Sequence, residues 1–505
     1  GKLMEKAWRE LVEGLGHVFG PEGRSITGLS YDSRRVEKGH LFFALPGQKT
    51  DGHRFIPEAL AKGAAALAIE EGKPFPQDVP VLVTPQVRRA MAYVAHRFYD
   101  KPAEKLLLVG VTGTNGKTTT AHMIREMLAT QVKTGLLGTL YALIGEERRP
   151  LPHTTPEAPD IERLLWEMVQ EGHGACVMEA SSEGIAQERV TALSFGAAAF
   201  TNLTQDHLNF HGTMENYYQA KARLFHEMLV GPAAIMVDDS WGERLAKEVT
   251  RPVITASAAG RKAHVRALEI QETMETIAFT LEVGELPQGL GTLWSGRRFA
   301  VTIPLGGSFT VANGTLALAT AAALNVPPEK ALWALSRLKP VPGRWELIQE
   351  GQPFSVVVDY AHTPAGLESL LAAARKTLAG KLICVFGAGG DRDREKRPLM
   401  GREGARVADV VIITSDNPRS EDPRAIIEEV ARGAEELARE RRIPLYKEED
   451  RKKAIALALQ LAEPGDGVVV AGKGHETTQT IGNQVLSFDD RQVVRSLLRE
   501  MGYRG

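Results

Sequence analysis

One segment of the sequence combines glycines, a lysine and hydroxyl side chains in a spacing that suits phosphate chemistry. It reads Gly110-Val-Thr-Gly113-Thr-Asn-Gly116-Lys117-Thr118-Thr119-Thr120 and lies between an apolar run at 106–109 and a helical run at 121–128. Glycines let backbone N–H groups face phosphate oxygens, and the N-terminus of a following helix favours negative charge. Lys117 can reach β- and γ-phosphates, and the Thr118 hydroxyl can bind magnesium. The segment therefore predicts a loop that binds the phosphates of a nucleotide.

This loop departs from the general phosphate-loop pattern at one position. The pattern has a glycine where this chain has Val111, whereas glycines stand at 110, 113 and 116. A glycine-rich turn without a ligand would not need the adjacent Gly-Lys-Thr. We therefore interpret the segment as a variant phosphate loop.

Polar or glycine-rich residues follow several other apolar runs. A run at 175–178 ends in Glu179, a carboxylate where magnesium bound to a nucleotide needs one. In the last third of the chain, runs at 356–358, 382–386, 410–414 and 468–471 precede Asp359, residues 387–398, 416–419 and 472–476. Ligands of open α/β sheets bind beyond the carboxyl ends of the strands. These polar residues are therefore candidate ligand contacts.

The elements that must position these residues alternate between short β-rich runs and helical segments. This alternation predicts an α/β fold with mostly parallel sheets. A chain of 505 residues exceeds one hydrophobic core, so we expect about three domains. Turn-rich joins at 99–102 and 339–343 divide it into 1–102, 103–339 and 340–505. Near the start, Trp8, Leu11, Val12 and Leu15 have the spacing of an amphipathic helix.

Composition and spacing argue against several other classes of protein. A net charge of -2 gives no broad positive field for nucleic acid. Cys176 and Cys384 lie far apart in apolar runs, so we expect buried thiols and no disulfide. Neither a signal pattern nor a membrane-spanning run is present, and we expect a cytoplasmic protein without membrane insertion. His207 and His211 could suggest zinc, but the HExxH glutamate is missing.

The phosphate loop, between its strand and its helix, resembles that of the Mur ligases and the related folylpolyglutamate synthases. Glu179-Ala-Ser181-Ser182 and Tyr218-Gln-Ala-Lys221 resemble further Mur ligase segments. The resemblance implies ATP and Mg²⁺ as cofactors and a carbamylated Lys221 (N6-carboxylysine). It implies magnesium contacts from Thr118, Glu179 and His207, and ATP contacts from Gly113, Thr114, Asn115, Gly116, Lys117, Thr118, Thr119, Asn313, Arg344 and Asp359. Outside the family, we would expect Asn313 to open a helix and Arg344 to be a surface charge.

Motifs of all three units resemble those of Mur ligases that act on a UDP-sugar dipeptide and diaminopimelate. For the UDP-sugar dipeptide the resemblance implies contacts from Tyr31, Ser33, Gln48, Lys49, Thr50, Thr154, Thr155, Ser181, Gln187 and Arg189. For diaminopimelate it implies contacts from Arg392, Asp416, Asn417, Pro418, Arg419, Gly472 and Glu476. Diaminopimelate has a second carboxylate that lysine and ornithine lack, and the planar guanidinium of Arg419 can bind it with two hydrogen bonds.

The resemblance implies an ATP-dependent ligase that forms an amide bond through an acyl phosphate. It would add meso-diaminopimelate to the D-glutamate of UDP-N-acetylmuramoyl-L-alanyl-D-glutamate in peptidoglycan synthesis. Lys117, Glu179, His207 and Lys221 are then the expected catalytic residues, and we expect a monomer. Three alternatives stay open: lysine or ornithine as the amino acid, a folylpolyglutamate synthase, and a nucleotide switch that ligates nothing.

Overall fold

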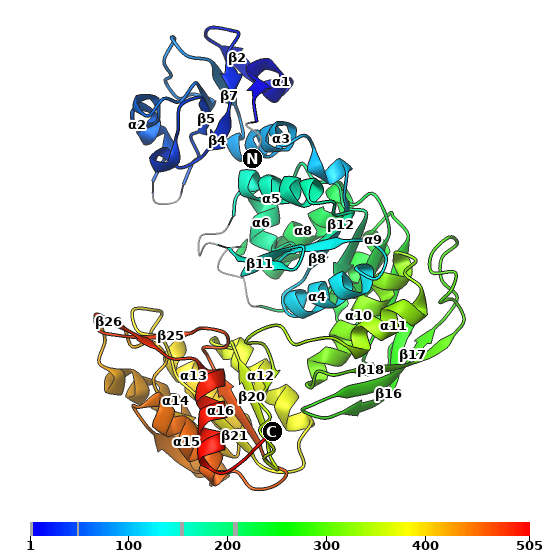
Figure 1. The fold of residues 1–505 in the computed structure, drawn as a ribbon, viewed down its shortest axis with the longest axis vertical. Coiled ribbons are helices and arrows are strands. Elements are labelled where there is room, and N and C mark those ends of the chain that lie inside the picture. The colour runs from blue at the N-terminus through cyan, green and yellow to red at the C-terminus, as the bar shows by residue number, and fades with distance from the viewer. Residues whose placement is uncertain (1–3, 48–49, 152–155, 206–210) are drawn as a thin grey trace.

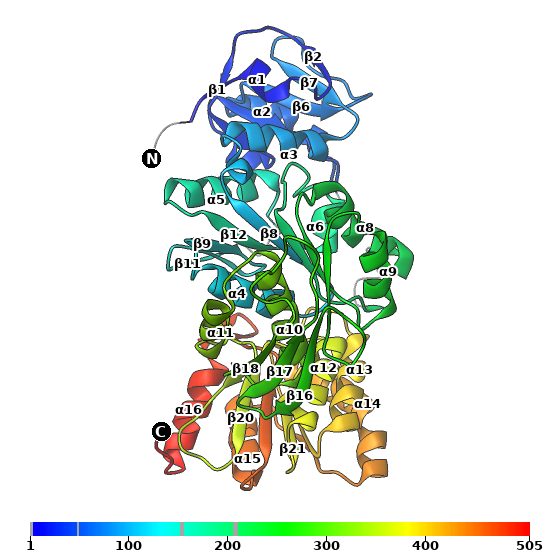
Figure 2. The same cartoon turned by 90° about the vertical axis from the view of Figure 1, so that its right-hand side faces the viewer.

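The structure, a computed structural model, describes residues 4–47, 50–151, 156–205 and 211–505. Figures 1 and 2 show α/β parts stacked along the long axis, with the N-terminal part at one end and the C-terminal part at the other. The predicted α/β class with mostly parallel sheets is confirmed. Cys176 and Cys384 are buried and free, also as predicted.

The N-terminal part is a small sheet with helices packed on it. Its elements are β1 (Lys6–Ala7), α1 (Trp8–Val12), β2 (His17–Phe19), β3 (Ser25–Ile26), β4 (Gly28–Ser30), β5 (His40–Phe43), α2 (Ile56–Ala61), β6 (Ala66–Glu70), β7 (Val81–Thr84) and α3 (Val87–Phe98). The strand order is β2-β7-β6-β5-β4, and β4 to β7 run parallel. The predicted N-terminal helix buries Trp8, Leu11 and Val12 but ends before Leu15, because Gly14 takes a φ of +76°.

The central part is built on one large sheet. Its first half contains β8 (Leu107–Thr112), α4 (Lys117–Leu128), β9 (Thr134–Leu137), β10 (Tyr141–Ile144), β11 (Glu147–Pro150), α5 (Ala158–Gln170), β12 (Ala175–Glu179), α6 (Ser182–Ala186), β13 (Ala197–Phe200) and α8 (Met214–Arg223). Its second half contains β14 (Ala233–Met236), α9 (Ser240–Glu248), β15 (Val253–Ser257), β16 (Val265–Glu272), β17 (Ile277–Val283), β18 (Arg298–Ile303), α10 (Ser308–Ala323) and α11 (Pro328–Ser336). The strand order is β11-β10-β9-β12-β8-β13-β14-β15-β16-β17-β18. β12 and β13 lie parallel to β8 on either side, so their carboxyl ends meet at the phosphate loop.

Helix α10 is apolar on nearly all sides and packs against α4 and the central sheet. The expectation that Asn313 opens a helix is wrong. The helix begins at Ser308, after Gly307 with a φ of +93°, and Asn313 lies in its buried interior. The start signal is thus the glycine pair at 306–307, upstream of Asn313.

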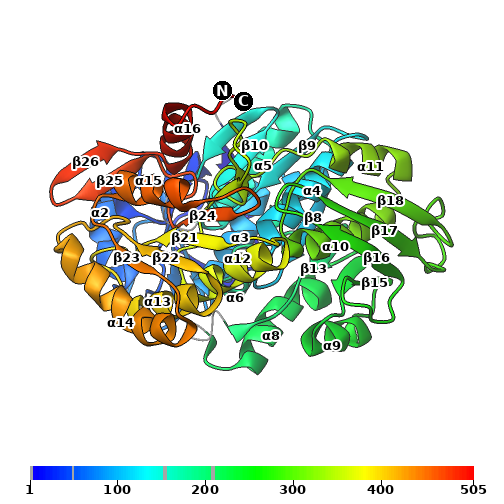
Figure 3. The same ribbon diagram turned by 90° about the horizontal axis from the view of Figure 1, so that it is seen from below.

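The C-terminal part is a parallel sheet with helices on both faces, and residues 339–343 connect it to α11. Its elements are β19 (Glu346–Leu347), β20 (Ser355–Asp359), α12 (Pro364–Lys376), β21 (Leu382–Phe386), α13 (Lys396–Val407), β22 (Val410–Ile413), α14 (Pro423–Arg441), β23 (Leu445–Lys447), α15 (Arg451–Leu461), β24 (Gly467–Ala471), β25 (Thr478–Ile481), β26 (Gln484–Ser487) and α16 (Asp490–Glu500). The strand order is β19-β20-β24-β21-β22-β23, parallel except for β19. Seen from below, α12 to α14 lie on one face and α15 and α16 on the other (Figure 3).

These sheets bring the polar residues that follow the strands to common edges. In the C-terminal part, β20, β21, β22 and β24 begin and end within two residues of the apolar runs read from the sequence. No helix within the described ranges combines the length and the apolar character that crossing a bilayer requires.

Candidate active site

The phosphate loop follows β8 and leads directly into α4. Gly113 and Gly116 have φ angles of +146° and +88°, in the region that favours glycine. A Cβ atom at Gly113 would lie 1.7 Å from Thr201 Oγ1, and one at Gly116 would lie 2.3 Å from Asn313 Oδ1. Neither position can hold a larger residue, so the backbone of the loop stays accessible to a phosphate group.

A hydroxyl and a carboxylate meet beside this loop. Thr118, in the first turn of α4, donates from Oγ1 to Glu179 Oε1 at 2.8 Å. Glu179 stands at the carboxyl end of β12, the neighbour of β8. A hydroxyl and one carboxylate, completed by phosphates and water, form a common magnesium site in nucleotide enzymes. The other predicted magnesium contact, His207, lies outside the described residues; among those described, no group of three or more His, Cys, Asp or Glu residues could hold a metal.

Two lysines converge on one carbonyl oxygen of the loop. Lys117 Nζ donates to the Gly113 oxygen at 2.8 Å, and Lys221 Nζ donates to the same oxygen at 2.7 Å. Lys221 comes from α8 and has an exposed fraction of only 1%. Burial, and then the positive charge of Lys117, lowers the pKa of the Lys221 amine well below its ordinary value. Its burial rules out a solvent-facing role for this lysine, and the lowered pKa favours the neutral form of its amine more than in an exposed lysine.

A cavity of about 520 Å³ extends from the phosphate loop to the C-terminal part. Most of the residues predicted to contact ATP line it: Thr114, Asn115, Gly116, Lys117, Thr118, Thr119, Asn313, Arg344 and Asp359. Gly113 lies in the loop itself. The cavity volume falls in the range of cofactor-sized sites. The central and C-terminal parts each contribute a wall.

The C-terminal wall is held by Asp359 at the end of β20. Its carboxylate accepts hydrogen bonds from the backbone N–H groups of Trp345 (2.7 Å) and Ala361 (2.8 Å). Burial raises the pKa of Asp359, although these hydrogen bonds oppose the change. Arg344 is half-buried, and its Nε atom has no hydrogen-bond partner among the described residues. A buried donor at a cavity wall is suited to an anionic or polar ligand.

Sequence reasoning missed several residues that line the same cavity. They are Phe309, Trp345, Tyr360, His362 and Thr363. Tyr360 packs against His362 with ring centroids 4.6 Å apart. The signal that could have found the last three is the polar and aromatic run that continues after Asp359, since it follows a strand in the same way as the other candidate segments. Phe309 and Trp345 precede Asp359 and reach the cavity only through the packing of distant segments.

The residues predicted to hold the UDP-sugar dipeptide lie in two places. Ser33 belongs to the N-terminal part and donates to Glu58 at 2.9 Å, whereas the Tyr31 phenol reaches across to Asp160 of α5. Ser181 caps α6, and its Oγ accepts from Gly184 N at 3.0 Å. Thr50 is exposed, and Gln48, Lys49, Thr154 and Thr155 lie outside the described residues.

Arg189 is a buried cation close to that cap. Its Nη2 donates to Gln187 Oε1 at 2.7 Å, and its Nε lies 3.6 Å from Glu157 Oε2. The Nη1 atom is buried and has no hydrogen-bond partner among the described residues. His211, which we did not assign to a metal, forms a hydrogen bond of 3.0 Å with Ser182.

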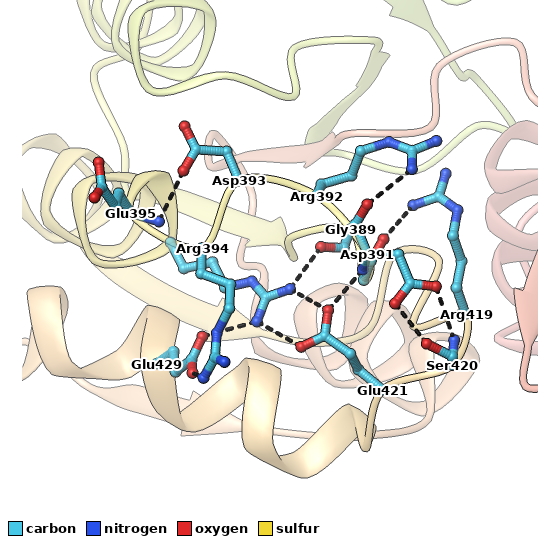
Figure 4. Close-up of polar contacts among 12 residues, drawn as sticks. Gly389, Asp391, Arg392, Asp393, Arg394, Glu395, Arg419, Ser420, Glu421 and Glu429 are labelled. Carbon is cyan, nitrogen blue, oxygen red and sulfur yellow. Dashed lines mark hydrogen bonds and ion pairs between the residues drawn. The ribbon is translucent and has the colours of Figure 1, made fainter.

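The predicted amino-acid contacts gather at the carboxyl edge of the C-terminal sheet. The side chains of Arg392 and Arg419 both pass over Gly389, where a Cβ atom would lie 3.0 Å from Arg419 Nη1 and 3.5 Å from Arg392 Cγ (Figure 4). Their guanidinium groups donate to neighbouring backbone oxygens of this loop, Arg392 Nη1 to Asp391 O at 3.0 Å and Arg419 Nη1 to Gly390 O at 2.8 Å. Two cations on one loop edge could receive carboxylates.

Acidic and amide groups stand near these two arginines. Asp416 and Asn417 follow β22 and are held by buried Lys473, whose Nζ lies 3.4 Å from Asp416 Oδ1 and 2.9 Å from Asn417 Oδ1. Gly472, with a φ of +118°, follows β24 and faces Asp416. Burial and then Asp416 raise the pKa of Glu476. This arrangement can bind a molecule that carries both carboxylate and ammonium groups.

Comparisons with known proteins agree with this geometry. Family models match along the chain: "Mur ligase family, catalytic domain" at residues 25–99, "Mur ligase middle domain" at 111–321 and "Mur ligase, glutamate ligase domain" at 343–474. A Gloeobacter violaceus protein named UDP-N-acetylmuramoyl-L-alanyl-D-glutamate–2,6-diaminopimelate ligase is 45% identical over 95% of both chains. A Streptomyces coelicolor protein of the same name is 44% identical over 97% of this chain and 96% of its own.

A solved structure with that same name in its title has a TM-score of 0.72 and 32% identity, and the match covers 99% of this chain and 100% of the other. The matched regions contain the phosphate loop, both walls of the cavity and the arginine pair. From these matches and the geometry of the site, we conclude that this chain belongs to the Mur ligase family.

Proposed function

We propose that this chain joins meso-diaminopimelate to the D-glutamate γ-carboxylate of UDP-N-acetylmuramoyl-L-alanyl-D-glutamate, with ATP converted to ADP and phosphate. The observation that carries the proposal is the pair Arg392 and Arg419 over Gly389, at some remove from the nucleotide cavity. One guanidinium can bind the α-carboxylate of an amino acid, and the second can bind a further carboxylate. Lysine and ornithine have only the α-carboxylate, so the second guanidinium would have no carboxylate to bind. The names of the relatives support the same substrates.

The reaction begins with transfer of the γ-phosphoryl group of ATP to the substrate carboxylate, which gives an acyl phosphate and ADP. The amine then attacks the acyl carbon, phosphate leaves, and one proton is released from the nitrogen. A lysine and a glycine loop near β- and γ-phosphates favour transfer at Pγ, because they stabilise charge on the transferring group. Lys117, in the phosphate loop, suits the first half of the reaction. Glu476, near Asp416 and Arg419, suits the second half because its carboxylate could hold the incoming ammonium group.

The residues beside the loop fit a nucleotide with magnesium. Thr118 and Glu179 would hold the metal, which supplies charge neutralisation on the phosphates when bound. Arg344 and Asp359 would contact the nucleotide from the C-terminal side. We further propose that the enzyme acts as a monomer in the cytoplasm, where ATP is available.

The test measures ADP and phosphate release with the UDP-sugar dipeptide and either diaminopimelate, lysine or ornithine. We expect turnover with diaminopimelate, and a loss of about 10- to 100-fold in kcat/KM for it in Arg419→Ala, because a charge-assisted bidentate contact is removed. Arg424→Ala is the matched control, since Arg424 is exposed near the start of α14 and its side chain pairs with Glu449 at 2.9 Å. A folate substrate in place of the dipeptide should give no ADP. Wild-type protein that forms no ADP and no amide with diaminopimelate would overturn the proposal.

A further inference from the structure

The two arginines of the amino-acid site stand on loops whose backbone is held in an unusual conformation. Arg392 follows Asp391, which has a φ of +56°, and Arg419 itself has a φ of +51°. Non-glycine residues in this region persist only where surrounding contacts hold them. Some part of the structure must therefore hold both loops in place.

Direct contacts tie the first loop, residues 387–395, to the second, residues 416–420. Gly390 N donates to Asn417 O at 2.8 Å, and Arg419 Nη1 donates to Gly390 O at 2.8 Å. Ser420 Oγ donates to Asp391 Oδ1 at 2.5 Å. A Cβ atom at Gly390 would lie 1.8 Å from Pro418 O, so the two backbones are as close as they can be. The loops therefore behave as one unit.

Beneath this unit lies Arg397, a side chain with an exposed fraction of 1% in the first turn of α13. It donates to both carboxylate oxygens of Glu421, at 3.0 and 2.6 Å, and to Glu429 Oε2 at 2.8 Å. It also donates to Gly389 O at 3.1 Å, and Gly389 is the residue that the Arg392 and Arg419 side chains approach.

Glu421 completes the connection between the loops. It follows the second loop, and its Oε2 atom accepts a hydrogen bond of 2.6 Å from Asp391 N in the first loop. Arg397 and Glu421 together thus hold the backbone directly before Arg392, and Glu421 itself follows the turn that carries Arg419. The Arg397 contact also keeps the pKa of Glu421 low, at about 2, so the pair is charged at neutral pH.

We propose that Arg397, acting through Glu421, is a positioning residue that sets the selectivity for an amino acid with two carboxylates. The proposal rests on the proposed function. Arg397 is buried beneath the loops and fixes the spacing of Arg392 and Arg419. A pair of guanidinium groups binds two carboxylates well only when their separation and orientation are held closely. An amino acid with a single carboxylate needs only one of the two guanidinium groups, so its binding does not depend on their spacing.

The test compares Arg397→Met and Glu421→Gln with wild type by steady-state kinetics. We expect the KM for diaminopimelate to rise about 10- to 100-fold, the range found when a residue that orients ligand-binding groups is removed. The KM values for ATP and the UDP-sugar dipeptide should stay within about twofold, since a merely structural defect would change all three. Discrimination against lysine should fall by the same factor as the affinity for diaminopimelate.

Arg406→Met is the matched control. Arg406 lies on the same helix and pairs with Glu368 and Glu403 at 3.0 and 2.9 Å, away from both loops. Its kinetic constants should equal those of wild type. The double variant Arg397→Met/Glu421→Gln should lose no more than the worse single variant, because the two residues act as one unit.

The outcomes separate this proposal from the proposed function. A wild-type protein without diaminopimelate-dependent ADP formation overturns both. A wild-type protein that selects diaminopimelate, together with variants that keep its KM and selectivity, overturns the positioning role alone. Should Arg397→Met fail to fold, Glu421→Gln decides the question, because Glu421 is partly exposed and its replacement keeps the shape of the side chain.

Discussion

The Lys221 amine is the group whose replacement would be most informative. Its Nζ and that of Lys117 donate to one carbonyl oxygen at 2.7 and 2.8 Å. The two nitrogens are therefore no more than about 5.5 Å apart, and two positive charges at that distance repel by about 3 kcal/mol at an effective dielectric constant of about 20. Loss of a proton from the Lys221 ammonium group removes this repulsion. Reaction of the resulting amine with CO₂ forms an N–C bond, releases a second proton and leaves a carbamate anion that Lys117 would attract.

We expect Lys221→Ala and Lys221→Arg to lower kcat by about a hundredfold or more, because about 3 kcal/mol of electrostatic stabilisation corresponds to about that factor in rate. The arginine variant keeps a cation but cannot form a carbamate, so it separates the two possible roles of the side chain. The assay is ADP release, with thermal unfolding as a check on folding.

Two further measurements complete this test. Wild-type protein in CO₂-depleted buffer should lose activity and regain it when bicarbonate is added, and ¹³C-bicarbonate should give a carbamate signal that is absent in Lys221→Ala. A short carboxylic acid should partly restore Lys221→Ala, since it can occupy the vacated space with a negative charge. Lys221→Arg with kcat within about threefold of wild type would refute the reasoning.

Replacing Glu179 by Gln should raise the Mg²⁺ concentration needed for half-maximal ADP release by about 10- to 100-fold, because the site beside Thr118 then lacks its negatively charged ligand. An unchanged magnesium titration would contradict this. Arg451→Met should lower the free energy of unfolding by about 3–5 kcal/mol, because it leaves Asp490 as an unpaired charge in a fully buried pair, and a loss below about 1 kcal/mol in denaturant unfolding would argue against that pairing. Burial raises the pKa of Glu162, against the opposing hydrogen bond from His96. Its contribution to stability is thus complete below the ordinary value of 4.5 and falls as the pH rises towards the raised pKa. Glu162→Gln should therefore gain stability relative to wild type as the pH rises above 4.5, and a difference that is constant with pH would be inconsistent with this cause.

The parts of the site that are contiguous in sequence were predictable from the sequence alone. The phosphate loop and its helix start at Lys117 are encoded within a few residues, because the glycines, the lysine and the hydroxyl all act locally. Buried parallel strands such as β21 were equally clear, since a short apolar run bounded by polar residues marks each of them.

The parts that depend on distant contacts were not predictable in the same way. Asn313 looked like a helix start, and only the packing of α10 against the loop places its amide beside Gly116. Lys221 on an amphipathic helix would ordinarily face solvent, and only the resemblance to a family suggested otherwise. Arg397 looked like one of many arginines in a polar segment. Its burial depends on Glu421 and Glu429, which belong to a different helix and its preceding loop.

The cavity between Asn313 and Asp359 has a consequence for inhibitor design. Its two walls pack largely on different sheets, residues 339–343 connect them along the chain, and Trp345 crosses between them with a hydrogen bond to Met274 O. Any rotation about residues 339–343 changes the size and shape of the space. A rigid compound that contacts both walls would bind only the interdomain angle that its own shape fits, whereas the binding of a compound confined to the phosphate loop would not depend on that angle.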